Sequence, residues 1–247
     1  MVATSLFKSH IDALLLLGDE VADRAIAIRT AGNAASPELL DLAVLFLART
    51  SQALESVGIL AERGLVGDAM AVGRTAVEMA IDFGYIAKLP GERIAMFESF
   101  ESVSNFKLVK AIQKLHGGAP EAAVAEAQRR YNIAVTNNPD SKANWAGKSI
   151  CDRAEAVGMS MLYKLAYAEM CTASHSSYGT LRYVLVNDGD EPTVRFGPVA
   201  PSARPITLTG MAFGMLIAQA LDACGGDATM TTRLAGLMDA NQRLIKP

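Results

Sequence analysis

One stretch of the sequence places three charged side chains at intervals of a helical turn. Arg74, Glu78 and Asp82 follow one another four residues apart inside an otherwise apolar segment. Residues four apart lie on one face of an α-helix, so Arg74 and Glu78 can form an ion pair worth about 0.2–0.5 kcal/mol when exposed. The apolar neighbours leave little room for an exposed polar face. A partly buried pair costs desolvation free energy, which favours a functional interpretation.

His175 is the histidine that the sequence favours for acid–base chemistry, because imidazole titrates near neutral pH. It stands at the end of a helical segment, whereas His10 and His116 are predicted to be surface residues. A structural, hydrogen-bonded histidine is the alternative. Cys171 lies four residues before His175, which is a spacing that zinc ligands use, but nothing marks a third or fourth ligand. We therefore predict neither a metal site nor a cofactor.

A second polar cluster, residues 144–149, contains Trp145 and Lys148. A lone tryptophan in a loop before a helix is typical of a residue that packs the loop onto the core. The end of this cluster, Gly-Lys-Ser, looks like the end of a phosphate-binding P-loop. That motif requires glycine at position 142, where the chain has Lys142, and an apolar strand before it. The P-loop interpretation is therefore excluded.

The elements that must position these residues are predicted to be helices, because apolar residues recur at helical spacing nearly throughout. We predict an all-α fold: a single helical domain over residues 1–247, with about eight or nine helices. Its parts are a two-helix hairpin (4–63), a central core (68–180), a small β-hairpin (181–196) and a closing helix pair (206–245). The uncharged stretch 205–221 is predicted to be a buried helix rather than a membrane span.

The composition limits the classes of function. Of the 247 residues, 51% are hydrophobic and 20% are charged, which excludes a disordered chain. A net charge of −3 argues against broad electrostatic binding of nucleic acid, although Lys107, Lys110 and Lys114 share one helical face. The three cysteines form no CxxC pair, and no signal peptide pattern opens the chain. These features predict a cytoplasmic protein that does not bind membranes.

Taken in order, the polar clusters resemble a bacterial group known as domain of unknown function family 5677. The resemblance covers about residues 40–185 and implies no function, since none is assigned to the group. The residues that carry it are Arg74, Glu78, Tyr85, Arg93, Phe97, Trp145, Gly147, Lys148, Ser149, Tyr163, Tyr167, Ser174 and His175. The helical layout also looks somewhat like HEPN domains, many of which are ribonucleases of defence systems. Their Arg-x(4–6)-His motif is absent, so Arg74 or Arg93 would have to supply the arginine.

Two hypotheses follow for the function. In the first, the protein is a hydrolase, with RNA as the substrate class suggested by the HEPN likeness. His175 and Glu78 would be catalytic, and the residues predicted to bind the anionic substrate are Arg74, Lys148, Arg93, Trp145 and Tyr85. In the second, the protein is a non-catalytic binding or dimerisation module in which these residues form a buried network. Gly210 and Gly214 would then lie in a homodimer interface.

Overall fold

The computed structural model describes residues 2–116, 120–142, 144–174, 185–188, 191–194 and 200–244. Most of them are helical, which confirms the predicted all-α class. The helices are α1 (Val2–Thr30), α2 (Pro37–Glu62), α3 (Val66–Lys88), α4 (Pro90–His116), α5 (Glu121–Asn137), α6 (Ile150–Ala156), α7 (Ser160–Leu162), α8 (Ala168–Ser174), α10 (Arg204–Ala223) and α11 (Ala228–Arg243). A 3-10 turn, η1 (Pro139–Lys142), and a π-helical turn, η2 (Tyr163–Tyr167), join them. The described residues hold nine helices when the unbroken segment 160–174 counts as one.

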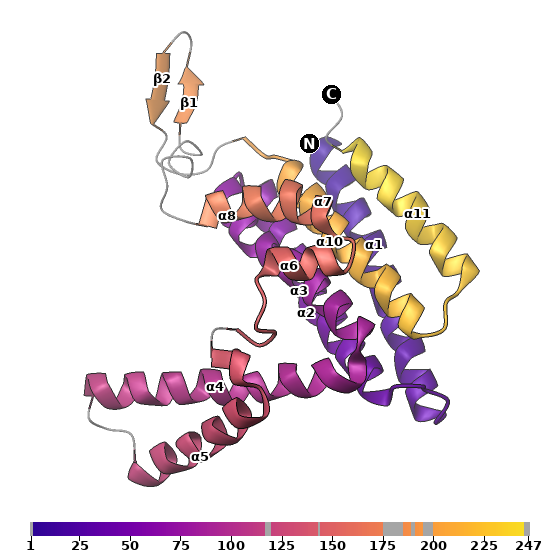
Figure 1. The fold of residues 1–247 in the computed structure, drawn as a ribbon. Coiled ribbons are helices and arrows are strands. Elements are labelled where there is room, and N and C mark those ends of the chain that lie inside the picture. Colours follow the sequence, from indigo (N-terminus) through magenta and orange to yellow (C-terminus); the bar gives the residue numbers. More distant parts are fainter. Residues whose placement is uncertain are drawn as a thin grey trace.

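Two short strands lie inside the segment for which a β-hairpin is predicted (Figure 1). β1 (Leu185–Asp188) pairs antiparallel with β2 (Glu191–Val194), so that Leu185 is opposite Val194 and Asp188 is opposite Glu191. The other residues of the predicted segment 181–196 lie outside the described part of the chain.

Four helices, α1, α2, α3 and α10, pack together into the bundle that holds the core (Figure 1). Each turns one apolar stripe inward, because apolar residues recur every three or four positions along it. Leu14 and Leu17 of α1 are completely buried, as are Ile81 of α3 and Phe213 of α10. These buried stripes hold α3, and therefore its charged residues, in a fixed place.

α10 lies at the centre of the bundle, because it contacts α1, α2 and α3 and is also packed by α11. A Cβ at Gly210 would lie 2.7 Å from Oδ1 of Asn241, and a Cβ at Gly214 would meet the side chain of Met238. Asn241 and Met238 both belong to α11. The hypothesis that these glycines line a homodimer interface is therefore wrong, since α11 of the same chain occupies that face.

Among the described residues, α2 and α10 are the two helices long and apolar enough to cross a membrane. Burial inside the bundle covers 50% of the most apolar stretch of α2 and 67% of that of α10. Both helices therefore serve as core helices in this structure.

α4 and α5 form an arm that extends away from the bundle (Figure 1). Pro90 occupies the first position of α4, where its missing N–H costs no hydrogen bond, so α4 starts almost directly after α3. Within the arm, the rings of Phe106 and Tyr131 lie 4.6 Å apart between their centroids. The outer part of α4 leaves Leu108 and Leu115 mostly exposed.

The segment from α6 to α8 covers one side of α3. Ser149 caps α6: its hydroxyl accepts from the N–H of Asp152, whose carboxylate accepts from the N–H of Ser149. The π-helical turn η2 interrupts the following helix between α7 and α8. A π-turn inserts one residue relative to an α-helix, and such turns are frequent at functional sites.

The prediction that His10 lies at the surface is wrong. Its side chain is only 7% exposed, and its Nε2 lies 3.0 Å from Oδ1 of Asn241. Asn241 in turn donates to the carbonyl oxygen of Thr207 at 2.8 Å. Burial lowers the pKa of His10, although the hydrogen bond with Asn241 acts in the opposite direction. His10 is therefore a structural link between α1, α11 and α10.

Candidate functional site

The Arg74–Glu78 pair is formed on α3, as its spacing predicts. Nε of Arg74 donates to Oε1 of Glu78 at 3.0 Å, and Nη2 of Arg74 lies 2.9 Å from the same oxygen. Only one carboxylate oxygen of Glu78 takes part in these contacts. The other oxygen, Oε2, is the part of Glu78 that a ligand can engage without displacing Arg74.

The π-helical turn η2 adds Tyr167 to this pair. The Tyr167 hydroxyl donates to Oε1 of Glu78 at 2.9 Å and accepts from Nη2 of Arg74 at 3.0 Å. The guanidinium carbon of Arg74 also lies 5.1 Å from the centroid of the Tyr167 ring, on which Tyr163 stacks at 5.2 Å. We call Arg74, Glu78 and Tyr167 the α3 site.

The α3 site is partly open to solvent, through Arg74 and Glu78, and its tyrosine is held in the protonated form. The side chain of Arg74 is 28% exposed and that of Glu78 is 36% exposed. Burial raises the pKa of Tyr167 well above its ordinary value, and its hydrogen bond to the Glu78 carboxylate raises the pKa further. Tyr167 therefore acts as a fixed hydrogen-bond donor at neutral pH.

A pocket of about 340 Å³ opens beside Glu78, between α2, α3 and α4. We call it the α2–α3 pocket. Its polar lining consists of Glu78, Asp82, Thr75 and Arg49. The remaining walls are apolar and comprise Leu42, Leu45, Phe46, Met79 and Phe97. A volume in this range suits a small molecule or a single group of a larger one.

One turn further along α3, Asp82 forms a second and more buried set of contacts. Nε of Arg153 donates to Oδ1 of Asp82 at 2.7 Å, and Nε1 of Trp145 donates to Oδ2 at 3.2 Å. The side chains of Arg153 and Asp82 are only 8% and 15% exposed. We call Asp82, Arg153 and Trp145 the Asp82 cluster.

Burial raises the pKa of Asp82 to about 6, although the charge of Arg153 and the hydrogen bonds from Trp145 and Arg153 act in the opposite direction. Nη1 of Arg153 also donates to the carbonyl oxygen of Lys148 at 2.6 Å. The cluster thus joins α3 to α6 and to the loop before it, and its members are engaged with one another.

Trp145, Tyr85 and Arg93, which the sequence proposes as binding residues, lie together behind the pocket wall. The Trp145 ring meets the edges of Tyr85 and Phe97 at centroid distances of 5.8 and 5.2 Å. The guanidinium carbon of Arg93 lies 3.6 Å from the Tyr85 ring centroid, and its Nη1 donates to the Tyr85 carbonyl oxygen. None of Trp145, Tyr85 and Arg93 lines the α2–α3 pocket. Trp145 packs the loop onto the core.

Lys148 does not join the α3 site, and the position of His175 is not described. Lys148 is exposed and does not line the α2–α3 pocket. α8 ends at Ser174, and His175 lies outside the described residues. Of the two residues predicted to be catalytic, Glu78 is therefore the one that the structure places at a pocket.

Sequence reasoning did not single out Arg153 or Arg49. Arg153 pairs with an aspartate 71 residues away, and no spacing rule connects the two. Arg49 is an exposed arginine on α2 with no feature that distinguishes it in the sequence. Tyr167 did carry a signal, because it belongs to the pattern that resembles family 5677.

No group of three or more His, Cys, Asp and Glu side chains suited to a metal ion is found among the described residues. Comparison with known proteins finds no matching curated protein and no matching solved structure. The model of the family of unknown function DUF5677 matches residues 40–192, which include α3, the arm and the segment from α6 to α8. The match spans more than half of the chain, and this protein belongs to the family of unknown function DUF5677.

Proposed function

We propose that the α3 site binds an anionic group of a substrate and that the protein is a HEPN-like hydrolase acting on RNA. The observation that carries the proposal is the Arg74–Glu78–Tyr167 triad, in which Arg74 and Glu78 are partly exposed and Glu78 lines the α2–α3 pocket. Paired ionisable groups beside a pocket are a common mark of a functional site. Arg74, the partner of Glu78, and Arg49 of the pocket lining are the two arginines that an anion can meet there.

The proposed roles follow from the hydrogen-bonding capacity of each group. Arg74 would turn from Glu78 to a phosphate oxygen of the substrate, since a guanidinium binds phosphate in the same forked geometry as carboxylate. Glu78 would then be free to accept the proton of the attacking hydroxyl. Tyr167 would keep Glu78 in place. His175, directly after α8, is proposed as the acid that protonates the leaving group.

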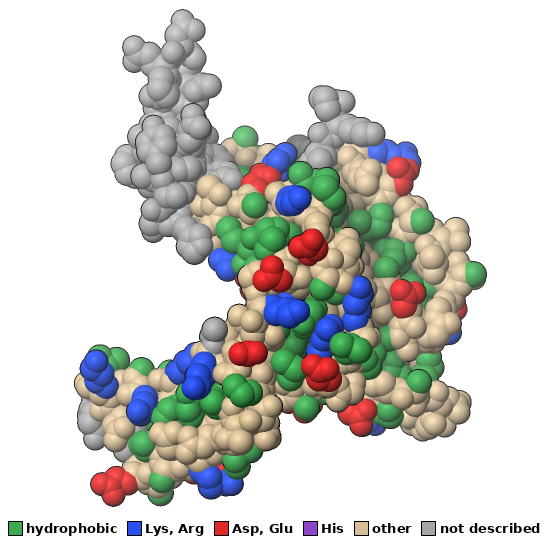
Figure 2. Space-filling view, in the orientation of Figure 1, with side chains coloured by type: hydrophobic (Ala, Val, Ile, Leu, Met, Phe, Trp, Pro, Cys, Tyr) green, Lys and Arg blue, Asp and Glu red, His purple; other side chains and the backbone are tan. Residues whose placement is uncertain are grey.

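The arm supports RNA as the substrate class. Lys107, Lys110 and Lys114 are exposed on α4, and Figure 2 shows basic side chains gathered on the arm although the chain as a whole is acidic. A local row of basic groups can bind phosphates without a basic protein overall. Its place next to the α2–α3 pocket, of which Phe97 of α4 is one wall, suits a strand that passes along both.

The test is cleavage of fluorescently labelled single-stranded RNA by the purified full-length protein. We expect wild type to cleave and Glu78→Gln to lose at least about a hundredfold in rate, because removal of a general base costs about 10²–10⁴. Glu155→Gln, at an exposed glutamate of α6, is the matched control and should cleave like wild type. Loss of activity in His175→Ala with unchanged stability would support the role of His175.

Cleavage that Glu78→Gln retains would place the chemistry elsewhere, and an inactive wild type would refute the hydrolase proposal. The second candidate, a non-catalytic module, is favoured by one observation: the members of the Asp82 cluster bond mainly to one another. Under that candidate, Glu78→Gln would lower the free energy of unfolding and change no activity. Cytoplasmic location and homodimer assembly stay predictions from the sequence.

A further inference from the structure

Arg49 is the charged group of the α2–α3 pocket that has no ion-pair partner among the described residues. Of the two carboxylates in the lining, Glu78 pairs with Arg74. The other carboxylate, Asp82, pairs with Arg153. Arg49 is exposed, and the hydrogen bond of its side chain goes to an uncharged glutamine side chain three residues further along α2, at 3.3 Å. The pocket therefore presents a guanidinium with most of its donors free for an anion.

The walls beside Arg49 include apolar side chains that stay uncovered. Leu45 lies one helical turn before Arg49 on α2 and also lines the pocket, yet it is 63% exposed. Phe97 of α4 is half-buried, and its ring is held by Phe46 and Trp145, whose ring centroids lie 5.5 and 5.2 Å away. An apolar surface of this kind beside an unpaired guanidinium suits a ligand that has both an apolar face and a negative charge.

Thr75 adds a polar group that a ligand in the pocket can reach. It is half-buried on α3, and its hydroxyl forms no hydrogen bond within the described part of the chain. Unlike the hydroxyl of Thr209, that of Thr75 is not sealed from solvent. A hydroxyl can donate and accept, so it suits the polar edge of a ring that carries both kinds of group. A plain hydrocarbon chain would leave it without a partner.

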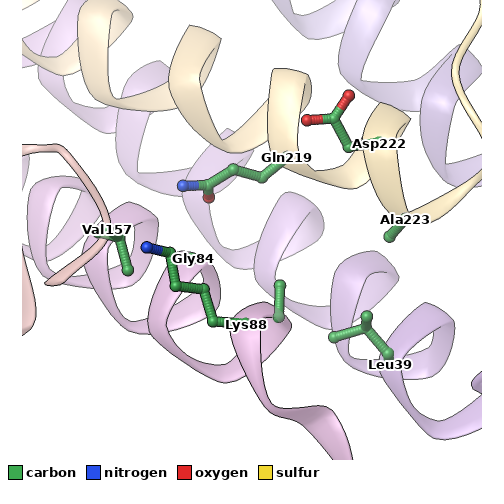
Figure 3. A pocket seen from close by; sticks show the side chains of 8 residues that line it. Leu39, Gly84, Lys88, Val157, Gln219, Asp222 and Ala223 are labelled. Atoms are coloured by element: carbon green, nitrogen blue, oxygen red, sulfur yellow. The ribbon is translucent and has the colours of Figure 1, made fainter.

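A second pocket, of about 350 Å³ between α3 and α10, lacks this combination. Figure 3 shows its lining, in which Lys88 and Asp222 bring one charge of each sign. The ammonium of Lys88 already donates to the carbonyl oxygen of Ala156. The described residues that line this second pocket include no aromatic side chain. Of the two pockets, the α2–α3 pocket is therefore the one that joins an unpaired guanidinium to an aromatic wall.

We propose that the α2–α3 pocket is a subsite for one unstacked nucleobase of the RNA strand, an inference that rests on the function proposed above. The face of the base lies against Phe97 and Leu45, and its polar edge meets the hydroxyl of Thr75. A phosphate of the same strand binds Arg49 in a charge-assisted hydrogen bond. Proteins commonly place the splayed bases of single-stranded RNA on aromatic side chains. A volume of about 340 Å³ lies at the small end of ligand pockets, which span about 300–1,000 Å³, and suits one base.

The subsite makes the protein selective for single strands. A base must leave its stack and its pairing partner to enter the pocket, so a base inside a duplex has no access. Glu78 lines the same pocket, so a base held there fixes the strand beside the group proposed to accept the proton. Base binding thus positions the substrate as well as holding it.

The test compares how tightly the full-length protein binds short single-stranded oligonucleotides with and without bases, by fluorescence anisotropy. Fluorescein-labelled 2′-O-methyl oligonucleotides carry only adenine, only cytosine, only uracil, or a mixture with guanine. The methyl group removes the hydroxyl that would attack, so binding is measured without cleavage. The matched control is an abasic oligonucleotide of the same length, which carries the same phosphates. We expect at least one oligonucleotide with bases to bind at least about fivefold more tightly than the abasic control.

Two pairs of variants assign the contacts, and circular dichroism checks that each is folded. Phe97→Leu should reduce the advantage over the abasic control at least about threefold, because it removes the aromatic face. Phe106→Leu, the same change on α4 at a ring that does not line the pocket, should leave that advantage unchanged. Arg49→Met should weaken binding of the oligonucleotide with bases at least about fivefold, because it removes the phosphate contact. Arg63→Met, at an exposed arginine outside the pocket, should bind like wild type.

The proposal is overturned if the abasic oligonucleotide binds as tightly as every oligonucleotide with bases, or if none binds at about 100 µM, the weak end of non-specific binding. It is also overturned if Phe97→Leu and Arg49→Met both bind as wild type does. A preference for bases in a protein that does not cleave RNA would refute the hydrolase and leave the subsite standing. Cleavage without a preference for bases would do the reverse.

Discussion

Glu78 and Asp82 are one helical turn apart on α3, but their surroundings give them different chemistry. Glu78 is 36% exposed at the edge of a pocket and shares one oxygen with Arg74 and Tyr167. Asp82 is almost sealed, and each of its two oxygens accepts from a separate partner. An exposed carboxylate can exchange its partners for a ligand, whereas a sealed one holds its neighbours in place. This difference supports the role proposed for Glu78, whereas Asp82 holds the loop in position.

The pKa of Asp82 predicts how stability depends on pH. Burial raises this pKa from 3.8 to about 6, so the folded chain holds the proton more tightly than the unfolded chain. Ionisation of Asp82 therefore lowers the free energy of unfolding as the pH rises from about 4 to above about 6. At about 1.4 kcal/mol per pKa unit, the loss is about 3 kcal/mol. Asp82→Asn carries no ionisable group there and should show no such loss.

The measurement is urea unfolding of wild type and Asp82→Asn at several pH values, followed by the fluorescence of Trp145. Trp145 is the only tryptophan, and it contacts Asp82. Between about pH 4 and about pH 7, stability should shift in favour of the variant by about 3 kcal/mol. Asp19→Asn, at an exposed site on α1, should show no such trend. A difference for Asp82→Asn that stays constant with pH would contradict the assigned effect of burial.

At the residue scale, the sequence predicted the contacts that helical spacing controls. Arg74 and Glu78 are joined by a local rule, and their pair is confirmed. Tyr167 meets Glu78 across 89 residues and Arg153 meets Asp82 across 71, so these contacts depend on how whole helices pack. The prediction that His10 is exposed was wrong, because nothing near His10 in the sequence indicates its hydrogen bond with Asn241.

At the scale of elements, α3 and α10 come close together where glycines of α3 face side chains of α10. Gly73 of α3 lies where a Cβ would be 2.9 Å from Cε of Met170 and would collide with Oγ1 of Thr209. Thr209 is buried, and its hydroxyl has no hydrogen-bond partner among the described residues. No volume is left for a side chain at position 73, so the contact between the two helices requires glycine there.

Gly73→Ala should lower the free energy of unfolding by about 1–3 kcal/mol, because the added methyl group overpacks the contact between α3 and α10. Gly236→Ala is the matched control inside α11, where nothing lies within 4 Å of the added Cβ. This control should raise stability by up to about 1 kcal/mol, because alanine favours a helix more than glycine does. Urea unfolding measures both. Equal changes in the two variants would show that helix propensity, rather than packing, dominates at Gly73.

The helices themselves were predictable, because apolar periodicity and cap residues are local signals. Ser149 caps α6 and Pro37 stands at the first turn of α2, and both residue types are typical of helix starts. The π-helical turn η2 was not predictable, since a single inserted residue changes the helical spacing too little to be seen. The arm was not predictable either, because contacts between α4 and α5, such as that of Phe106 with Tyr131, have no local signal in the sequence.

At the scale of the whole molecule, charge is divided unevenly. The chain carries a net charge of −3, but residues 104–135 of the arm contain five Lys and Arg against two Glu. Some of this charge is paired locally, since Arg129 and Arg130 both bind Glu126. Lys107 and Lys110 remain exposed on α4. The outer part of the arm thus presents a positive surface, whereas α4 and α5 as a whole carry six Lys and Arg against five Glu.

Replacing Lys107, Lys110 and Lys114 together by glutamine should weaken RNA binding and make it less dependent on salt. Each phosphate contact contributes about 0.7 to the slope of log affinity against log salt for single strands, so the slope should fall by about two. Fluorescence anisotropy at several salt concentrations measures it. The control replaces Lys8 and Lys164, exposed lysines outside the arm, and should leave the slope unchanged. An unchanged slope in the triple variant would exclude the arm as the RNA-binding surface.

The central place of α10 affects how the chain reaches its fold during synthesis. α10 fills the space between α1, α2 and α3, yet it begins at residue 204, after the family-matched residues 40–192. A nascent chain that has emerged from the ribosome only as far as residue 192 therefore exposes the apolar faces that α10 later covers. Chaperones that bind apolar surfaces can bind the chain during the time before α10 emerges. The bundle can therefore form completely only after α10, near the end of the chain, has been synthesised.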